Sequence, residues 1–164
     1  MDVIDRLLEH DDWGTKQLFE LSRDLTDAQL DQPFDIGHQT LRQTFDHLIF
    51  NIAFWTGLMV GKPLEARQDY EQAERSMAQM TERYGRYWTA FATLARQVSD
   101  EHRLDDTFVD HWGERPTLGG AVVHVVLHNA EHRTELVHML TRLGVSPEAL
   151  EVDHLLWEHK TKSV

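Results

Sequence analysis

The chain has 164 residues, no cysteine and a formal net charge of −12. The lack of cysteine excludes disulfides, thiolate nucleophiles and thiolate-bound zinc, so any metal must be held by histidine and carboxylate side chains. The acidic charge, without a cluster of Lys or Arg, argues against nucleic acid and anionic membrane surfaces as partners, because both need a positive face. The length is typical of a single domain over residues 1–164 with one substantial core.

The sequence carries no signal for export or membrane insertion. Its first six residues, Met1–Arg6, are acidic where a secretory signal needs a basic start. No apolar run reaches the ~18 residues that are needed to cross a bilayer. We therefore expect a cytoplasmic protein.

Apolar residues at helical spacing predict a first helix over about residues 2–24, with acidic residues on the opposite face. Asp2 is placed to cap this helix, and Asp5 is placed to interact with the positive end of its dipole. The apolar stripe consists of Leu7, Leu8, Trp13, Leu18, Leu21 and Leu25. A polar turn is predicted over residues 26–30, before a stretch with Pro and Gly that lacks regular structure.

A capping box, Thr40 with Gln43, opens a second predicted helix that runs to about Val60. This helix is apolar nearly all round, which is typical of a helix at the centre of its bundle. Its apolar residues are Leu41, Phe45, Leu48, Ile49, Ile52, Phe54, Trp55, Leu58 and Met59. His47 and Asn51 lie among them, one turn apart, and buried polar side chains need partners. Taken alone, His47 is best interpreted as a hydrogen-bonded core histidine.

A third helix is predicted over about residues 69–98, and its largely aromatic stripe is interpreted as core. The stripe contains Met77, Met80, Tyr84, Tyr87, Trp88, Phe91 and Leu94. Periodicity is lost over residues 99–116, although residues 107–110 alternate weakly and permit a short extended segment. A loop of this length in a compact domain is often functional or forms a crossover.

A fourth helix is predicted over about residues 117–143, ended by Gly144. Its core stripe consists of Val122, Val125, Leu136, Met139, Leu140 and Leu143. Ser146 and Pro147 then open a short last helix as N-cap and first helical residue. That last helix carries Leu150, Leu155, Leu156 and Trp157. The polar tail over residues 160–164 is expected to fray.

Three histidines recur at a spacing of four in the predicted fourth helix, at His124, His128 and His132. This spacing places them on one helix face, one turn apart, where two imidazoles can bind one metal ion. With 11 histidines in 164 residues, about one such pair is expected by chance. A face of solvated histidines is therefore the alternative interpretation, and a third ligand from elsewhere must decide between the two.

Together these motifs resemble the DinB/YfiT-like family of metalloenzymes over nearly the whole chain. The resemblance rests on Leu7–Trp13 and Thr40–Leu48, and above all on His124–Arg133 followed by Leu143–Pro147. It implies an all-α fold, a four-helix bundle with a short extra C-terminal helix. It also implies a divalent metal ion bound by one histidine of the second helix and an H-x3-H pair of the last long helix.

The ligands implied by the resemblance are His47, His128 and His132, and the implied metal is nickel or zinc, with iron and manganese as alternatives. His124 is expected nearby rather than as a ligand. Three neutral imidazoles leave further coordination positions to water or substrate, which is typical of a catalytic site. The other ring nitrogen of each ligand should be oriented by a carboxylate or a carbonyl. The carboxylates within sequence reach are Asp46, Glu131 and Glu135.

Two functions from different classes follow from the resemblance. The first is a metal-dependent enzyme of thiol-transferase or hydrolase type that acts on a small-molecule substrate, in the first case together with a low-molecular-weight thiol. The alternative is a stress-associated metal-binding or scaffold protein without turnover. An open, substrate-sized pocket with converging polar groups at the metal would favour the enzyme. No further catalytic residue and no organic cofactor is predicted, and a homodimer is left open.

Overall fold

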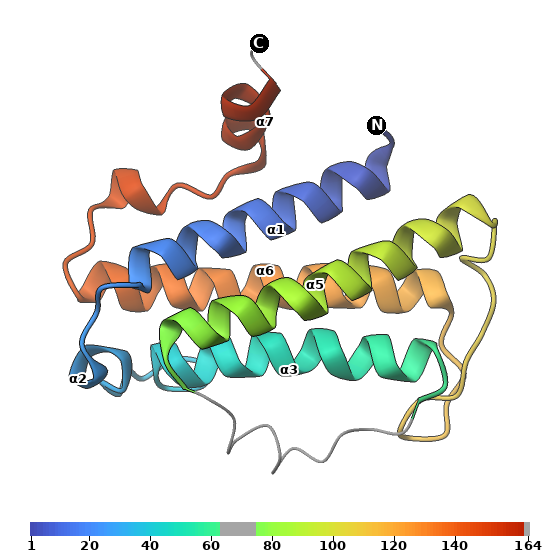
Figure 1. Ribbon diagram of the computed structural model, residues 1–164, viewed down its shortest axis with the longest axis horizontal. Coiled ribbons are helices and arrows are strands. Elements are labelled where there is room, and N and C mark those ends of the chain that lie inside the picture. The colour runs from blue at the N-terminus through green and yellow to red at the C-terminus, as the bar shows by residue number, and fades with distance from the viewer. Residues whose placement is uncertain (63–74, 163–164) are drawn as a thin grey trace.

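The computed structural model describes residues 1–62 and 75–162. The elements within these residues are α1 (Val3–Ser22), α2 (Asp27–Leu30), α3 (Leu41–Met59), α5 (Met77–Asp100), α6 (Leu118–Arg142), the 3-10 helix η1 (Pro147–Leu150) and α7 (His154–Lys162). The four long helices lie alongside one another, with α1 and α6 running in one direction and α3 and α5 in the other (Figure 1). The predicted all-α four-helix bundle with a short extra C-terminal helix is confirmed.

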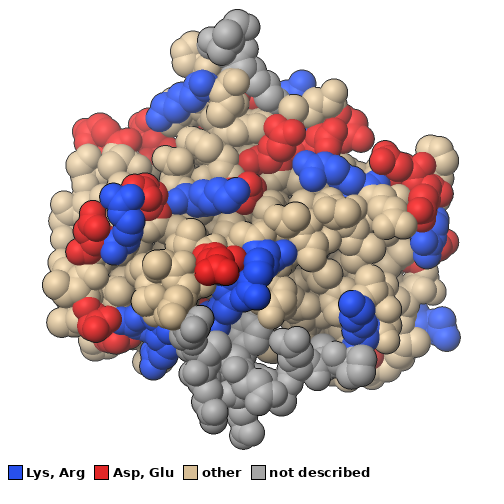
Figure 2. All heavy atoms as spheres, viewed as in Figure 1, with Lys and Arg blue, Asp and Glu red and all other residues tan. Residues whose placement is uncertain are grey.

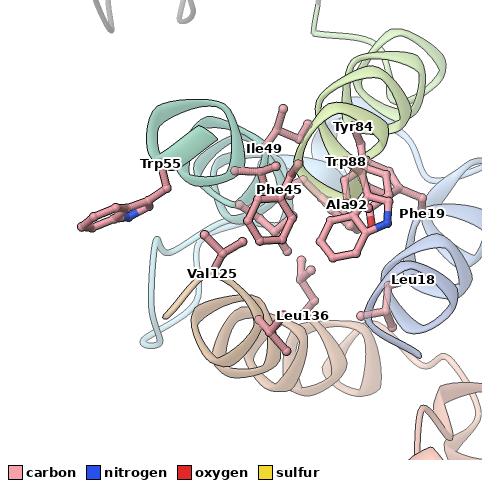
Figure 3. Packing of buried hydrophobic residues seen from close by; sticks show 14 of the residues in the cluster. Leu18, Phe19, Phe45, Ile49, Trp55, Tyr84, Trp88, Ala92, Val125 and Leu136 are labelled. Carbon is pink, nitrogen blue, oxygen red and sulfur yellow. The ribbon is translucent and has the colours of Figure 1, made fainter. Parts of the chain in front are cut away.

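Each long helix has two main neighbours. Helices α1 and α3 both pack against α5 and α6, so they occupy opposite corners of the bundle. Helix α3 is therefore not the central helix that its apolar surface predicts. Part of that apolar surface does not pack in the core between the helices. Phe50 and Phe54 stay partly exposed, and Trp55 points away from the other labelled core residues (Figure 3).

The core between the four long helices is aromatic at its centre. The rings of Phe19 and Phe45 stack with centroids 4.2 Å apart, and the Tyr84 ring lies 5.4 Å from Phe19 (Figure 3). The predicted stripes of the second, third and fourth helices supply most of this core. The stripe members that are only partly buried are Phe54, Tyr87, Leu94 and Leu143.

Several predicted helix ends are confirmed by their capping bonds. The Thr40 hydroxyl accepts a hydrogen bond from the Gln43 N–H at 3.1 Å, which is one half of the predicted capping box. At the end of α6, Gly144 adopts φ +89°, a conformation that glycine reaches without steric cost. The Val145 N–H then donates to the Leu140 carbonyl at 3.1 Å, so this end is a Schellman motif.

Two boundaries differ from prediction because of capping boxes that the sequence analysis missed. The predicted polar turn over residues 26–30 contains one turn of helix, α2, since Thr26 and Gln29 bond reciprocally across it. The third helix starts later than predicted, because α5 begins directly after its N-cap Ser76. Residues 69–74 of the predicted helix lie outside the described residues.

The predicted single last helix is two elements, η1 and α7, separated by three non-helical residues. The Asp153 carboxylate accepts a hydrogen bond from the Leu155 N–H at 2.8 Å, and this local bond starts a new helix. Trp157 anchors α7 because its side chain is only 3 % exposed. Most of the tail expected to fray is therefore helical up to residue 162, and residues 163–164 lie outside the described chain.

The connection between α5 and α6 folds back on itself. The extended segment expected over residues 107–110 amounts to one antiparallel bridge between Thr107 and Thr117. Beyond this bridge the Asp110 carboxylate accepts hydrogen bonds from the Trp112 and Glu114 N–H groups, which tightens the turn. The turn therefore lies close to the N-terminal end of α6.

Charged side chains of both signs are interspersed on the face shown in Figure 2, where Lys and Arg lie beside Asp and Glu and form no continuous basic patch. Within residues 1–62 and 75–162, none of the helices has the length and apolar character that a membrane span requires.

A buried polar cluster joins α1 to α6. Asp11 is fully buried, forms an ion pair with Arg133 and accepts a hydrogen bond from the Asn129 amide at 2.8 Å. Burial raises the pKa of the Asp11 carboxyl, while the guanidinium and the amide act in the opposite direction. The prediction that the acidic residues of this helix face outward is wrong for Asp11, because α6 supplies its counter-charge. Leu7 of the predicted stripe is exposed instead.

Asp11→Ala should lower the free energy of unfolding by about 3–5 kcal/mol, because it leaves the Arg133 guanidinium buried without its counter-charge. Glu20→Ala, which removes an exposed carboxylate from the same helix, should leave stability nearly unchanged. Urea denaturation followed by circular dichroism measures both variants. Equally small losses would show that the buried pair does not hold α1 against α6.

Candidate metal centre

The three predicted ligands come from two neighbouring helices. His47 projects from α3, and His128 and His132 project from successive turns of α6. The Nε2 atom of His128 lies 3.2 Å from the Nε2 atom of His47 and 3.2 Å from that of His132. Because α3 and α6 pack directly against each other, the structure brings all three predicted residues to one point.

The spacing of these nitrogens fits a metal ion. Imidazole nitrogens bound at ~2.0–2.1 Å around a tetrahedral ion lie ~3.3 Å from one another. The separations of 3.2 Å around His128 meet this requirement without any movement of the helices. The residues present therefore fit a divalent ion in both donor type and spacing.

Glu135 orients one of the three rings. Its carboxylate lies 2.7 Å from Nδ1 of His132, so Nδ1 donates a proton to it and Nε2 directs its lone pair toward the other histidines. The other two candidates for this role do not take it: Asp46 pairs with Arg83, and Glu131 is exposed. Residues three positions apart are neighbours on one helix face, so the sequence allowed Glu135 to bind the His132 ring. The sequence did not exclude Asp46 or Glu131 from that role.

His128 is held in the form that binds cations. Burial above all, together with the nearby rings of His132, His124 and His38, lowers its pKa from 6.5 to about 4. The ring is therefore neutral at pH 7, and a neutral imidazole offers a lone pair to a metal ion.

A fourth histidine, which the sequence analysis missed, reaches the same point. The His38 ring stacks on His47 with centroids 3.8 Å apart and lies 5.2 Å from the His132 ring. One ring nitrogen from each of His38, His47 and His132 lies within 4.8 Å of the other two. His38 thus meets the cluster at His47 and His132. His38 belongs to the loop before α3, where no helical periodicity relates it to the other three.

His124, the first histidine of the α6 series, lies next to this cluster. Its ring centroid is 5.7 Å from that of His128 and 4.7 Å from that of Trp55. The side chain is exposed. Its location agrees with the expectation of a nearby residue.

A cavity of about 550 Å³ opens beside the histidines, and His47 and His128 form part of its wall. Helix α3 and the connection before α6 supply aromatic side chains to the same wall. These aromatic residues are Phe50, Phe54, Trp55, His111 and Trp112. The interpretation of the long connection as a functional loop therefore has a structural basis, since its turn covers one side of the cavity.

Polar groups also reach this cavity, from Asn51, Asp110 and His124. Asn51 is only 7 % exposed, and its amide nitrogen has no hydrogen-bond partner among the described residues. A buried amide donor needs an acceptor, and because this nitrogen has almost no accessible surface, a molecule in the cavity would reach it only after the side chain turns. Asn51 follows His47 by one helical turn, which the sequence analysis noted without assigning a role.

Comparison with known proteins identifies the family. Among solved structures, a DinB-like protein from Bacillus cereus superposes with a TM-score of 0.59 at 20% sequence identity, covering 85% of this chain and 92% of that chain. This likeness establishes the fold alone. No curated protein matches the chain. The model of the DinB family matches residues 1–162, so this chain, whose histidine cluster is compatible with metal binding, belongs to the DinB family.

Proposed function

We propose that this protein binds a divalent metal ion through His47, His128 and His132 and is a metal-dependent enzyme acting on a small molecule in the adjoining cavity. One observation carries the proposal: His47 and His128 belong both to the convergent cluster and to the wall of a cavity of about 550 Å³. A cavity of this size falls in the range that accommodates small-molecule ligands. A scaffold role without turnover requires no such opening beside the histidines.

The chain's own groups prepare the site for a cation. Imidazole suits zinc, nickel and iron, and the low pKa of His128 keeps that ring neutral at pH 7. Glu135 keeps the proton of His132 on Nδ1, so that Nε2 is free to bind. When bound, a divalent ion supplies Lewis-acid polarisation and lowers the pKa of a thiol or of water, which suits thiol transfer or hydrolysis.

The cavity wall supports a class of substrate. Phe54, Trp55 and Trp112 offer apolar ring surface, which favours a substrate with an apolar or aromatic part. Asn51 lines the cavity beside His47, and a turn of its side chain would let the amide donate a hydrogen bond to a carbonyl or carboxylate oxygen. Since the chain has no cysteine, a thiol needed for transfer would enter as a second substrate.

His128→Ala should abolish stoichiometric metal binding yet leave a cooperatively folded helical protein. The four long helices bury a large apolar core, which should be sufficient for folding without the ion, so the free energy of unfolding should change by no more than about 1–3 kcal/mol. Elemental analysis of untagged protein and thermal melts by circular dichroism test both parts. If the variant or the chelated wild type is unfolded at 25 °C, the ion is structural and the proposed catalytic role loses its basis.

In the metal-free protein, the His128 ring should titrate near pH 4 rather than near 6.5. The unfolded chain takes up this proton at the higher pH, so the stability of the metal-free protein should fall as the pH is lowered from 6.5 toward 4. Imidazole chemical shifts followed by NMR measure the titration, and denaturation at each pH measures the stability. A His128 titration at the ordinary value would contradict the burial of this ring.

Metal-loaded protein should turn over a small substrate with an apolar group, either by hydrolysis or by transfer of an added low-molecular-weight thiol. Phe54→Ala should reduce kcat/KM for that substrate about tenfold, because an apolar contact in a pocket contributes on the order of 1–3 kcal/mol. Leu155→Ala, which changes an exposed side chain of α7, is the control. Dependence on the added thiol separates transferase from hydrolase. Turnover that persists in His128→Ala would contradict a metal-dependent mechanism.

A further inference from the structure

We infer that His38 is a fourth metal ligand, so that the bound ion is held by four imidazoles rather than three. The inference rests on the proposed metal binding by the other three histidines. A ring nitrogen of His38 lies within 4.8 Å of ring nitrogens of both His47 and His132. Ligand nitrogens of a tetrahedral ion are ~3.3 Å apart, so His38 has to approach the His47 and His132 nitrogens by no more than about 1.5 Å.

The backbone next to His38 adopts a conformation that directs this ring toward His47. The Thr40 N–H donates to the His38 carbonyl at 2.9 Å, which closes a three-residue turn around Gln39. Gln39 has φ +69°, as in the rare and strained form of the γ-turn. A residue other than glycine persists in such a conformation only when its surroundings hold it there, and such positions cluster at functional sites.

Contacts with α6 hold the loop in place. Phe34 is buried, and the guanidinium of Arg142 lies over its ring at 5.1 Å from the centroid. Gly37 has φ +50°, and a Cβ atom at this position would overlap the carboxylate of Glu135. The same carboxylate accepts the hydrogen bond from His132. The loop that carries His38 is therefore positioned by a residue that also orients a proposed ligand.

His38 reaches the cluster from a side that the cavity does not use. The described residues that line the cavity include His47 and His128, but neither His38 nor His132. A ring that exchanges protons with a substrate would have to reach the cavity, so this location favours a ligand over an acid or base. Four imidazoles fill a tetrahedral ion, so a substrate that enters from the cavity would bind as a fifth ligand, on the side that His38 does not occupy.

Titration of metal-free protein with Co²⁺ tests the inference, because the visible absorption of the bound ion reports its ligands and geometry. His38→Gln should weaken Co²⁺ binding at least about tenfold, or ~1.4 kcal/mol, and should alter the absorption bands. The matched control His138→Gln, which changes an exposed histidine of α6 that lines neither the cavity nor the cluster, should leave affinity and spectrum as in the wild type. Unchanged affinity and spectrum in His38→Gln would overturn the inference while metal binding by the other three stands.

Failure of the proposed function has a different signature. If wild-type protein binds no Co²⁺, or if His128→Ala binds it as tightly as wild type, the three-histidine site itself is wrong, and the inference about His38 falls with it.

A second pair of variants keeps the His38 ring and changes only the turn that carries it. Gln39→Gly tolerates the positive φ and should bind Co²⁺ as the wild type does. Gln39→Pro forces φ near −65° and should reproduce the loss seen in His38→Gln, because the ring is displaced. Circular dichroism checks that both variants are folded. Wild-type affinity and spectrum in Gln39→Pro would contradict delivery of the ligand by this turn.

Discussion

The ion pair between Asp11 and Arg133 sets the rotation of α6 about its own axis, and the site depends on that rotation. Arg133 directly follows His132, so the two side chains point to different sides of the helix. With Arg133 held toward α1 by a fully buried carboxylate, His132 and His128 face α3. A rotated α6 would leave a buried charge without its partner and would separate the imidazole nitrogens.

An apolar interface alone would specify this arrangement less sharply. Apolar side chains accept alternative packings at modest cost, whereas a buried charge tolerates only the position where its partner lies. The Asn129 amide, which donates to the same carboxylate, follows His128 in the sequence as Arg133 follows His132. Each histidine of the H-x3-H pair is thus followed by a residue bonded to α1.

Two loops add residues to the histidine cluster and to the cavity beside it. The bundle places three imidazoles with small separations, since rigid helices position side chains well. The loop before α3 adds His38, and the connection before α6 adds Trp112 and other residues to the cavity wall. Loops carried by a rigid scaffold are where recognition commonly resides, because their sequence is less constrained by packing. In this protein the helices supply three of the clustered imidazoles, and the loops supply a fourth ring and part of the cavity wall.

Local patterns in the sequence were sufficient for the long helices and for part of the site. Periodicity and capping residues predict α1, α3, the body of α5, and α6, because each depends on neighbours within a few residues. The spacing of His128 and His132 places both on one face for the same reason. The resemblance to DinB/YfiT-like proteins added His47, which spacing alone could not connect to them.

Only the tertiary structure decided the features that join distant segments. The sequence predicts that Asp11 faces outward, whereas in the structure it is paired with the guanidinium of Arg133 on α6, 122 positions later in the chain. His38 lies in a loop whose path depends on the contact between Gly37 and Glu135, and no repeating pattern encodes such a contact. The cavity likewise needs α3, α6 and the connection between α5 and α6 to be assembled. Periodicity determines which face of a helix is apolar, but the partner of that face is decided by packing in three dimensions.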